Sequence, residues 1–156
     1  MNRRLRVSLF AALVAVSACD DGDAAKKDEP AGGPVKLDTL GVQVDLPSGW
    51  SHAEKRGEQW VSRSMTYGAK LETVETMPAS LEDAKKSLFL QGKATDEGKK
   101  GDALYAVIEA DFGNMVLPYV FVVTPVGKAA VMCSGQLQEG DDAKALVDVC
   151  LTMKAL

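Results

Sequence analysis

The sequence is poor in the residues that carry most enzyme chemistry. Its 156 residues include one histidine, His52, and three cysteines, Cys19, Cys133 and Cys150. A single imidazole excludes metal sites with several histidine ligands, and a Ser-His-Asp triad would have to be built around His52. No serine lies in a Gly-x-Ser-x-Gly pattern, and Gly32-Gly33 does not connect a strand to a helix as a phosphate-binding loop does. We therefore expect no catalytic residue, metal site or cofactor.

The sequence also lacks an apolar run long enough to span a bilayer. A spanning helix needs about 20 apolar residues, whereas the run from Leu5 to Val16 ends well before Asp20. Arg3 and Arg4 precede this run, Arg6 lies at its start, and small residues follow it, which is the pattern of a secretory signal peptide. Because Ser17 and Ala18 directly precede Cys19, we predict a lipoprotein signal peptide over residues 1–18, with fatty acids attached to Cys19.

The predicted anchor places the protein in the bacterial cell envelope. Each buried acyl methylene contributes about 0.8 kcal/mol, so two or three chains would hold the protein on a membrane. Asp20 directly after the lipidated cysteine resembles the inner-membrane retention signal of enteric bacteria. We expect the periplasmic side of the inner membrane in preference to the outer membrane.

The first residues after Cys19 contain no large apolar side chain. From Asp20 to Pro34 the sequence reads DDGDAAKKDEPAGGP, which cannot bury enough surface to offset its conformational entropy. We interpret residues 19–34 as the lipidated cysteine and a disordered tether, and residues 35–156 as one globular domain. The acids lack the loop length and downstream carboxylate of a known calcium motif.

Basic residues are in the minority, which disfavours a nucleic-acid partner. Cleavage after Ala18 removes three arginines and no acid, leaving 15 bases and 22 acids, a formal charge of −7. Such a chain repels phosphate backbones. Solubility explains this acidity, and an acidic face for a basic partner is the alternative.

The first half of the domain predicts three strands and a helix. Val42, Val44 and Leu46 alternate with polar residues in a strand over 41–46, which ends at a Pro-Ser-Gly turn. Segments 59–64 and 66–76 are β-prone. Ser80 and Asp83 form a capping box that predicts a helix running to Gln91. Residues 93–101 are charged, and we expect an exposed loop there.

The second half predicts three more strands and a second helix. Residues 103–112 alternate with a period of two, Gly113-Asn114 predicts a two-residue turn, and residues 115–124 are apolar on both faces, which favours a central strand. Pro118 cannot donate to a ladder, so we expect a bulge or the end of pairing there. After a turn over 125–127 comes a strand over 129–137. The final helix, 141–153, has an apolar stripe of Ala143, Leu146, Val147, Cys150 and Met153.

Cys133 and Cys150 both lie on apolar faces that should meet. In an oxidising compartment we predict a disulfide between them. Two buried free thiols are the alternative, and a redox-active pair is disfavoured because such cysteines usually form a CxxC motif near a helix start.

The order of elements predicts an α+β fold, in which two helices pack on a mainly antiparallel sheet of about six strands. The segment Gly41–Trp50, GVQVDLPSGW, resembles the opening strand and Pro-x-Gly-Trp turn of the PsbP and Mog1-like family, which includes bacterial lipoproteins of the DcrB kind. The resemblance implies a PsbP/Mog1-like sandwich that binds partners such as a photosystem, a small GTPase or a secretion effector, and it implies no catalytic residues. Metal sites of plant members use histidine and acidic ligands, and the one histidine of this sequence is His52.

Aromatic residues make up 6% of the sequence, and Trp50 and Trp60 are the largest of them. Core packing is the usual role of such residues, and an exposed aromatic binding surface is the alternative. The favoured function is a non-enzymatic, membrane-anchored lipoprotein that binds another envelope protein. A small-molecule or lipid carrier with an apolar pocket is the second hypothesis, and a hydrolase that uses His52 is the third.

Overall fold

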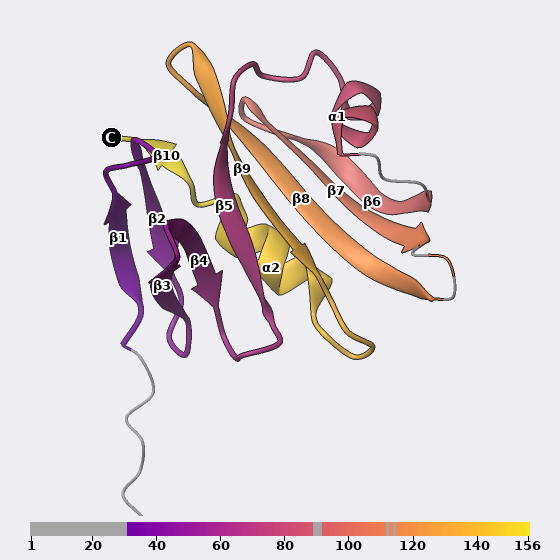
Figure 1. Ribbon diagram of the computed structural model, residues 1–156, viewed down its shortest axis with the longest axis horizontal. Helices are drawn as coiled ribbons and strands as arrows, with labels where there is room; N and C mark the ends of the chain where they lie inside the picture. Colours follow the sequence, from indigo (N-terminus) through magenta and orange to yellow (C-terminus); the bar gives the residue numbers. More distant parts are fainter. Residues whose placement is uncertain (1–30, 89–91, 112, 114) are drawn as a thin grey trace, which may run out of the picture.

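The computed structural model describes residues 31–88, 92–111, 113 and 115–156. The predicted signal peptide, Cys19 and most of the predicted tether lie outside the described residues. No helix within the described part of the chain is long and apolar enough to cross a membrane. The folded part contains two antiparallel sheets and two short helices (Figure 1).

The larger sheet has seven strands in the order β3-β4-β5-β9-β8-β7-β6, and every neighbouring pair is antiparallel. Their bounds are β3 Ser51–Lys55, β4 Glu58–Ser62, β5 Gly68–Val74, β6 Gly92–Lys100, β7 Ala103–Asp111, β8 Val116–Val126 and β9 Ala129–Gln136. The predicted α+β class with a mainly antiparallel sheet is confirmed. The expected strand number of about six is too low, because seven strands form this sheet and three form another.

The smaller sheet has the order β1-β2-β10, with β1 Gly33–Leu37, β2 Val42–Leu46 and β10 Lys154–Ala155. The predicted strand over 41–46 is therefore present as β2, but it pairs outside the main sheet. β1 begins at Gly33, so the predicted tether is two residues too long at this end. Its pairing with β2 orders Gly33 and Pro34, although neither residue has an apolar side chain suited to a strand.

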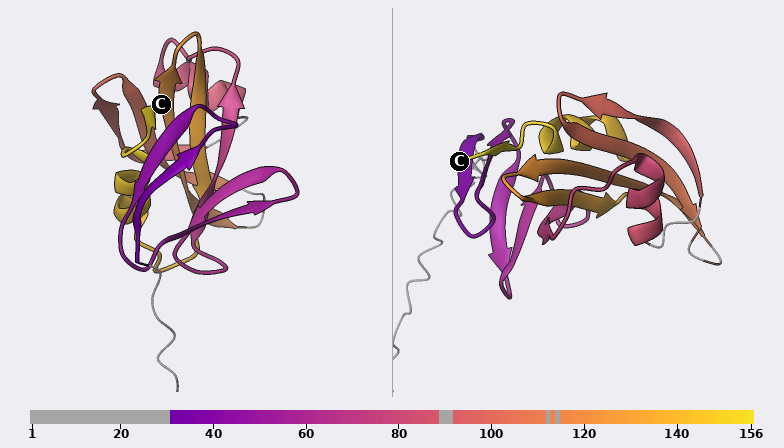
Figure 2. Two further views of the ribbon diagram at one scale, coloured as in Figure 1. Left: turned by 90° about the vertical axis from the view of Figure 1, so that its left-hand side faces the viewer. Right: turned by 90° about the horizontal axis from the view of Figure 1, so that it is seen from above.

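The two helices, α1 Leu81–Ser87 and α2 Ala143–Cys150, cover opposite faces of the main sheet (Figure 2). Alternation along β8 divides the core between them. Val120 and Val122 pack in the cluster that contains α2 and the small sheet, whereas Phe121 and Val123 pack in the cluster that contains Ala84 of α1. All four β8 side chains are buried, which is why this strand is apolar on both faces.

The start of α1 is as predicted, but both helices are shorter than predicted. The Ser80 side chain accepts a hydrogen bond from the Asp83 N–H at 3.1 Å and caps α1, which ends at Ser87 rather than Gln91. Residues 89–91 lie outside the described part. In α2 the cap is Asp142, so the predicted start at 141 is two residues early, and Met153 is buried beyond the helix end.

β6 corrects the prediction of an exposed loop over residues 93–101. This edge strand pairs with β7 along its length and contains a bulge between Ala94 and Asp96. Its side chains are mostly exposed and charged, so the sequence carries no apolar alternation. The long, regular edge of β7 supplies the hydrogen bonds that make it a strand, while its charges and bulge protect the edge from further pairing.

The hairpin after β7 differs from the predicted two-residue turn. The last register pair is Asp111 with Val116, so four residues connect the strands, and residues 112 and 114 lie outside the described part.

Pro118 is paired with β7 without interruption, whereas register pairs with β9 begin only at Tyr119. The Pro118 carbonyl accepts the Leu137 N–H at 2.8 Å. The predicted end of pairing is thus confirmed on the β9 side alone, and β8 continues through Pro125, where a turn was expected.

Candidate functional site

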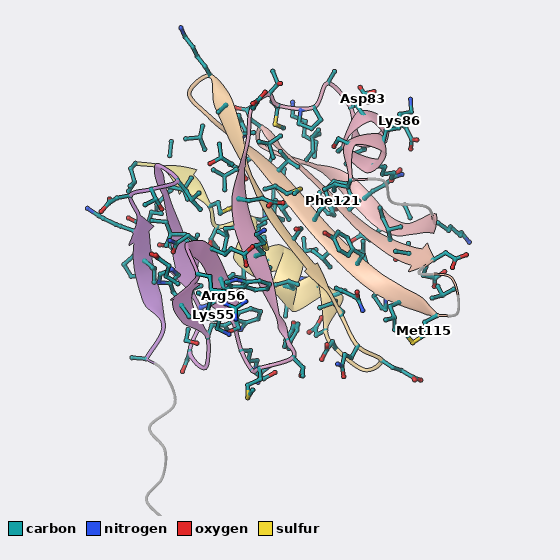
Figure 3. All side chains as sticks on the ribbon, viewed as in Figure 1. Lys55, Arg56, Asp83, Lys86, Met115 and Phe121 are labelled. Atoms are coloured by element: carbon teal, nitrogen blue, oxygen red, sulfur yellow. A yellow bond between two sulfur atoms is a disulfide. The ribbon has the colours of Figure 1, made fainter. Side chains whose placement is uncertain are left out.

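An open groove of about 690 Å³ crosses the face of β4, β5 and β9 that α2 does not cover. Register pairs Trp60 with Lys70 and Lys70 with Ser134, so these three side chains form one row across the floor. Further along the same face, α1 covers the cluster that contains Phe121 (Figure 3). The groove is therefore the part of this sheet face that no helix covers.

The β3–β4 hairpin forms one wall of the groove. It projects from the sheet on the same side as α1, as seen from above in Figure 2. Lys55 and Arg56 lie at its tip (Figure 3), and both line the groove together with Glu58. The hairpin thus places charged side chains along the rim.

The tip of this hairpin has an unusual residue at its turn. Arg56 has φ +55° and Gly57 has φ +82°, the pattern of a type I′ turn between Lys55 and Glu58. Arg56 is the sole residue other than glycine with positive φ among the described residues. A left-handed conformation costs a branched or long L residue about 1 kcal/mol, and asparagine is the usual choice here. The fold therefore holds an arginine at this position at some conformational cost.

The two acids of the groove share one cation. The Lys70 ammonium contacts Glu58 at 2.9 Å and Glu72 at 3.1 Å. These hydrogen bonds, that of Glu58 first, raise the pKa of Lys70, and the hydrogen bond from Lys70 lowers the pKa of Glu58. The side chains are partly exposed, so solvent limits the energy of the pairs. Their main effect is to hold both carboxylates beside Lys70.

Trp60 is half-buried on the floor. Its indole N–H is covered and forms no hydrogen bond within the described residues, although it lies close enough to Glu58 to lower the pKa of that carboxyl slightly. The remaining lining includes the polar side chains of Ser62, Ser134 and Gln136 together with Tyr119 and Met65. An aromatic ring among hydroxyl and amide groups suits a peptide better than a hydrocarbon chain.

The two predicted binding-surface tryptophans have different positions. Trp50 is 4% exposed, packs in the α2 cluster and contacts the Tyr67 ring edge-on at a centroid distance of 5.2 Å. It is a core residue, so the favoured interpretation of core packing is confirmed for Trp50 and the alternative of a binding surface is wrong. Trp60 does line the groove.

The two cysteines lie in the same core cluster as Trp50, where Cys133 of β9 and Cys150 of α2 form the predicted disulfide.

Sequence reasoning missed the basic residues of the groove. No motif marks Lys55, Arg56 and Lys70 in the sequence. They line one groove only because the β3–β4 hairpin projects over the sheet face that carries Lys70. The available signal was Arg56-Gly57 between two β-prone segments, which is compatible with a two-residue hairpin turn.

His52 does not lie in the groove and has no nucleophile as its partner. Its Nε2 lies 2.6 Å from the Gln59 amide oxygen, and the Gln59 amide nitrogen donates to Glu54 at 2.9 Å. Because an amide oxygen only accepts, the imidazole Nε2–H is the donor. This arrangement occupies Nε2 and gives no support to a hydrolase built on His52.

Within the described residues, no group of three or more histidine, cysteine or acidic side chains is placed to hold a metal ion.

These layers and this sheet order define an α+β domain with the PsbP-like fold. Among solved structures, the chain is similar to the solution structure of cyanobacterial PsbP (CyanoP) from Synechocystis sp. PCC 6803, with a TM-score of 0.53. The two share 12% sequence identity, and the similarity covers 90% of this chain and 100% of that one. No family model matches the sequence, and no curated protein matches it. The likeness establishes the fold and supports the resemblance noted at the Gly41–Trp50 segment.

Proposed function

We propose that this protein is a non-enzymatic lipoprotein of the cell envelope that binds another envelope protein in the groove on β4, β5 and β9. The observation that carries the proposal is the groove itself, an uncovered sheet face with Trp60 on a hydrogen-bonding floor and cations on its rim. Protein interfaces favour this combination of aromatic and arginine side chains.

The lipid anchor would confine the search for a partner to the membrane surface. Acylation at Cys19 fixes one end of the chain, and the domain begins at β1. The intervening segment of roughly 13 residues has a typical reach of about 20 Å if it behaves as a flexible coil. Tethering raises the effective concentration of a membrane partner, so the groove can work with modest intrinsic affinity.

The carrier hypothesis gains no support from the chemistry of this site. A lipid or small-molecule carrier needs a concave, mainly apolar pocket, whereas the groove is open and its floor carries Ser62, Ser134 and the Lys70 ion pairs. The apolar side chains of the two clusters are buried against one another.

Site-specific photo-crosslinking in intact cells tests the proposal. A photoreactive residue replaces Met65, which is fully exposed beside the groove, and the control replaces Lys144, whose side chain is 81% exposed on α2. We expect a discrete protein adduct from position 65 and none from position 144. Equal adducts from both positions, or none from position 65 under any growth condition, would refute binding in the groove.

A further inference from the structure

The groove carries an excess of positive charge. Three bases line it, Lys55, Arg56 and Lys70, against two acids, Glu58 and Glu72. Lys70 is engaged by both acids. Within the part of the chain that the structure describes, no salt bridge engages Lys55 or Arg56. In a chain with 22 acids and 18 bases, Lys55 and Arg56 add two positive charges to the groove, beside Glu58, which is paired with Lys70.

The backbone at Arg56 points to a use for its side chain. The turn places arginine where asparagine or glycine is conformationally easier. A planar guanidinium with five donors binds a carboxylate through two parallel hydrogen bonds, which asparagine cannot do. Strain at an exposed turn beside a groove is therefore consistent with a binding role for the residue held there.

The floor of the groove suits an extended backbone. Each residue of a peptide presents one N–H and one C=O, and Ser62, Ser134 and Gln136 offer hydroxyl and amide groups for both. The groove crosses three neighbouring strands and is open along the sheet face. A helix or a folded surface would find fewer matching groups there.

We propose that the occupant of the groove is an extended, acidic segment of the partner protein, and that Arg56 binds one of its carboxylates, with Lys55 as the second cation. This inference rests on the proposed function, because it names the chemistry of the segment that the same groove binds. Arg56 is thereby the residue that determines specificity for acidic sequences.

Peptide binding to the purified full-length protein in detergent tests this inference. The probe is a fluorescent peptide that alternates glutamate and valine, and the matched probe alternates lysine and valine. Fluorescence anisotropy should detect binding of the acidic probe alone, weakened by added salt. Arg56→Gln should weaken it about tenfold or more, as expected for loss of a charge-assisted bidentate pair, and Arg56→Lys should recover part of the loss.

Lys144→Gln on α2 is the control variant, and it should bind the acidic probe as the parent protein does. Lys55→Gln provides a second rim variant if Arg56→Gln proves unstable. Equal binding of both probes, or unchanged binding by both rim variants, would overturn the inference. If position 65 still crosslinks a protein in cells in that case, the groove binds a partner of another chemistry and only the inference about acidity fails.

Two other occupants give distinct results that would also overturn the proposal. If the acidic probe binds only after deletion of residues 20–30, the groove belongs to the chain's own acidic segment. If vesicles of phosphatidylglycerol displace the probe from Arg56 with no protein adduct at position 65, the rim is a membrane contact.

Discussion

Arg56 illustrates how a single residue can serve binding against its own conformational preference. Its φ of +55° is accessible to asparagine at lower cost. We expect Arg56→Asn to raise the free energy of unfolding by about 0.5–1 kcal/mol, while it weakens binding of the acidic probe. Urea unfolding measures the first effect. A destabilised Arg56→Asn protein would show that the arginine side chain stabilises the fold and is not held there for binding.

Tyr67, directly before β5, gives a pH-dependent test of its contact with the N-terminal cap of α2. Its hydroxyl donates to the Asp142 carbonyl at the cap of α2. Burial first, and then the charges of Asp142 and Asp141, raise the pKa of Tyr67 above its usual value. An unfolded tyrosine loses its proton near pH 10, so above about pH 10 the unfolded state binds fewer protons and stability falls as pH rises through the folded pKa.

We therefore expect the parent protein to lose stability above about pH 10 more steeply than Tyr67→Phe. Unfolding free energies measured across this range compare the two proteins, and near neutral pH the variant should be the less stable because it lacks the hydrogen bond. Parallel curves for the two proteins at alkaline pH would contradict the assignment.

The two tryptophans show what a sequence reveals at the residue scale. Both were candidates for core packing or for a binding surface, and the residue type alone does not distinguish these two roles. Trp50 follows the Pro-Ser-Gly turn and is buried against Tyr67. Trp60 lies in an alternating strand. Whether its face of the sheet is covered depends on where α1 packs, which is set by the tertiary structure and not by the local sequence.

At the scale of elements, the disulfide holds α2 on the sheet. Cys133 and Cys150 are both fully buried and lie 17 residues apart. For a loop of this length the chain-entropy model gives a stabilisation of about 3 kcal/mol. We expect the free energy of unfolding of the Cys133→Ala/Cys150→Ala double variant, measured by urea denaturation, to be lower by about 3 kcal/mol.

Addition of a reductant provides the control for the disulfide prediction. It should lower the stability of the parent protein and leave the double variant unchanged. An equal response of the two proteins to the reductant would show that the disulfide does not contribute in solution.

Elements with strong local signals were predictable, and those that form only because another strand offers them an edge were not. The Ser80 cap fixes the start of α1, and alternation of period two identifies β7. β6 and β10 carry exposed side chains and no apolar pattern. They are strands because β7 and β2 present free edges to them, which the residues of β6 and β10 do not themselves reveal.

At the scale of the whole molecule, the predicted anchor determines where the groove can act. We expect Cys19→Ser to block lipid attachment, so that the protein leaves the membrane fraction or keeps its leader. Mass spectrometry of the mature protein should find residues 1–18 absent and an acylated Cys19 at the new amino terminus. A mature protein that retains Met1 would contradict the anchor and leave the domain untethered.

The fold class was predictable from the order of elements, but its division into two sheets was not. The chain returns at its end to place β10 beside β2, and the Leu156 N–H donates to the Gly41 carbonyl at 3.0 Å. β10 has only two residues, which is too short for a sequence periodicity to be detected. The groove was unpredictable for a related reason, because it exists only where α1 leaves the sheet face uncovered.

Filling the groove provides the most direct test of the account. Gln136 is exposed on β9 and lines the groove, so Gln136→Trp should occupy its floor without disturbing the core, and Lys144→Trp provides a matched change on α2. The measurement is the yield of the protein adduct from a photoreactive residue at position 65 in each background. We predict that Gln136→Trp abolishes the adduct while Lys144→Trp preserves it; an adduct undiminished in the filled groove would contradict the claim that partners bind there.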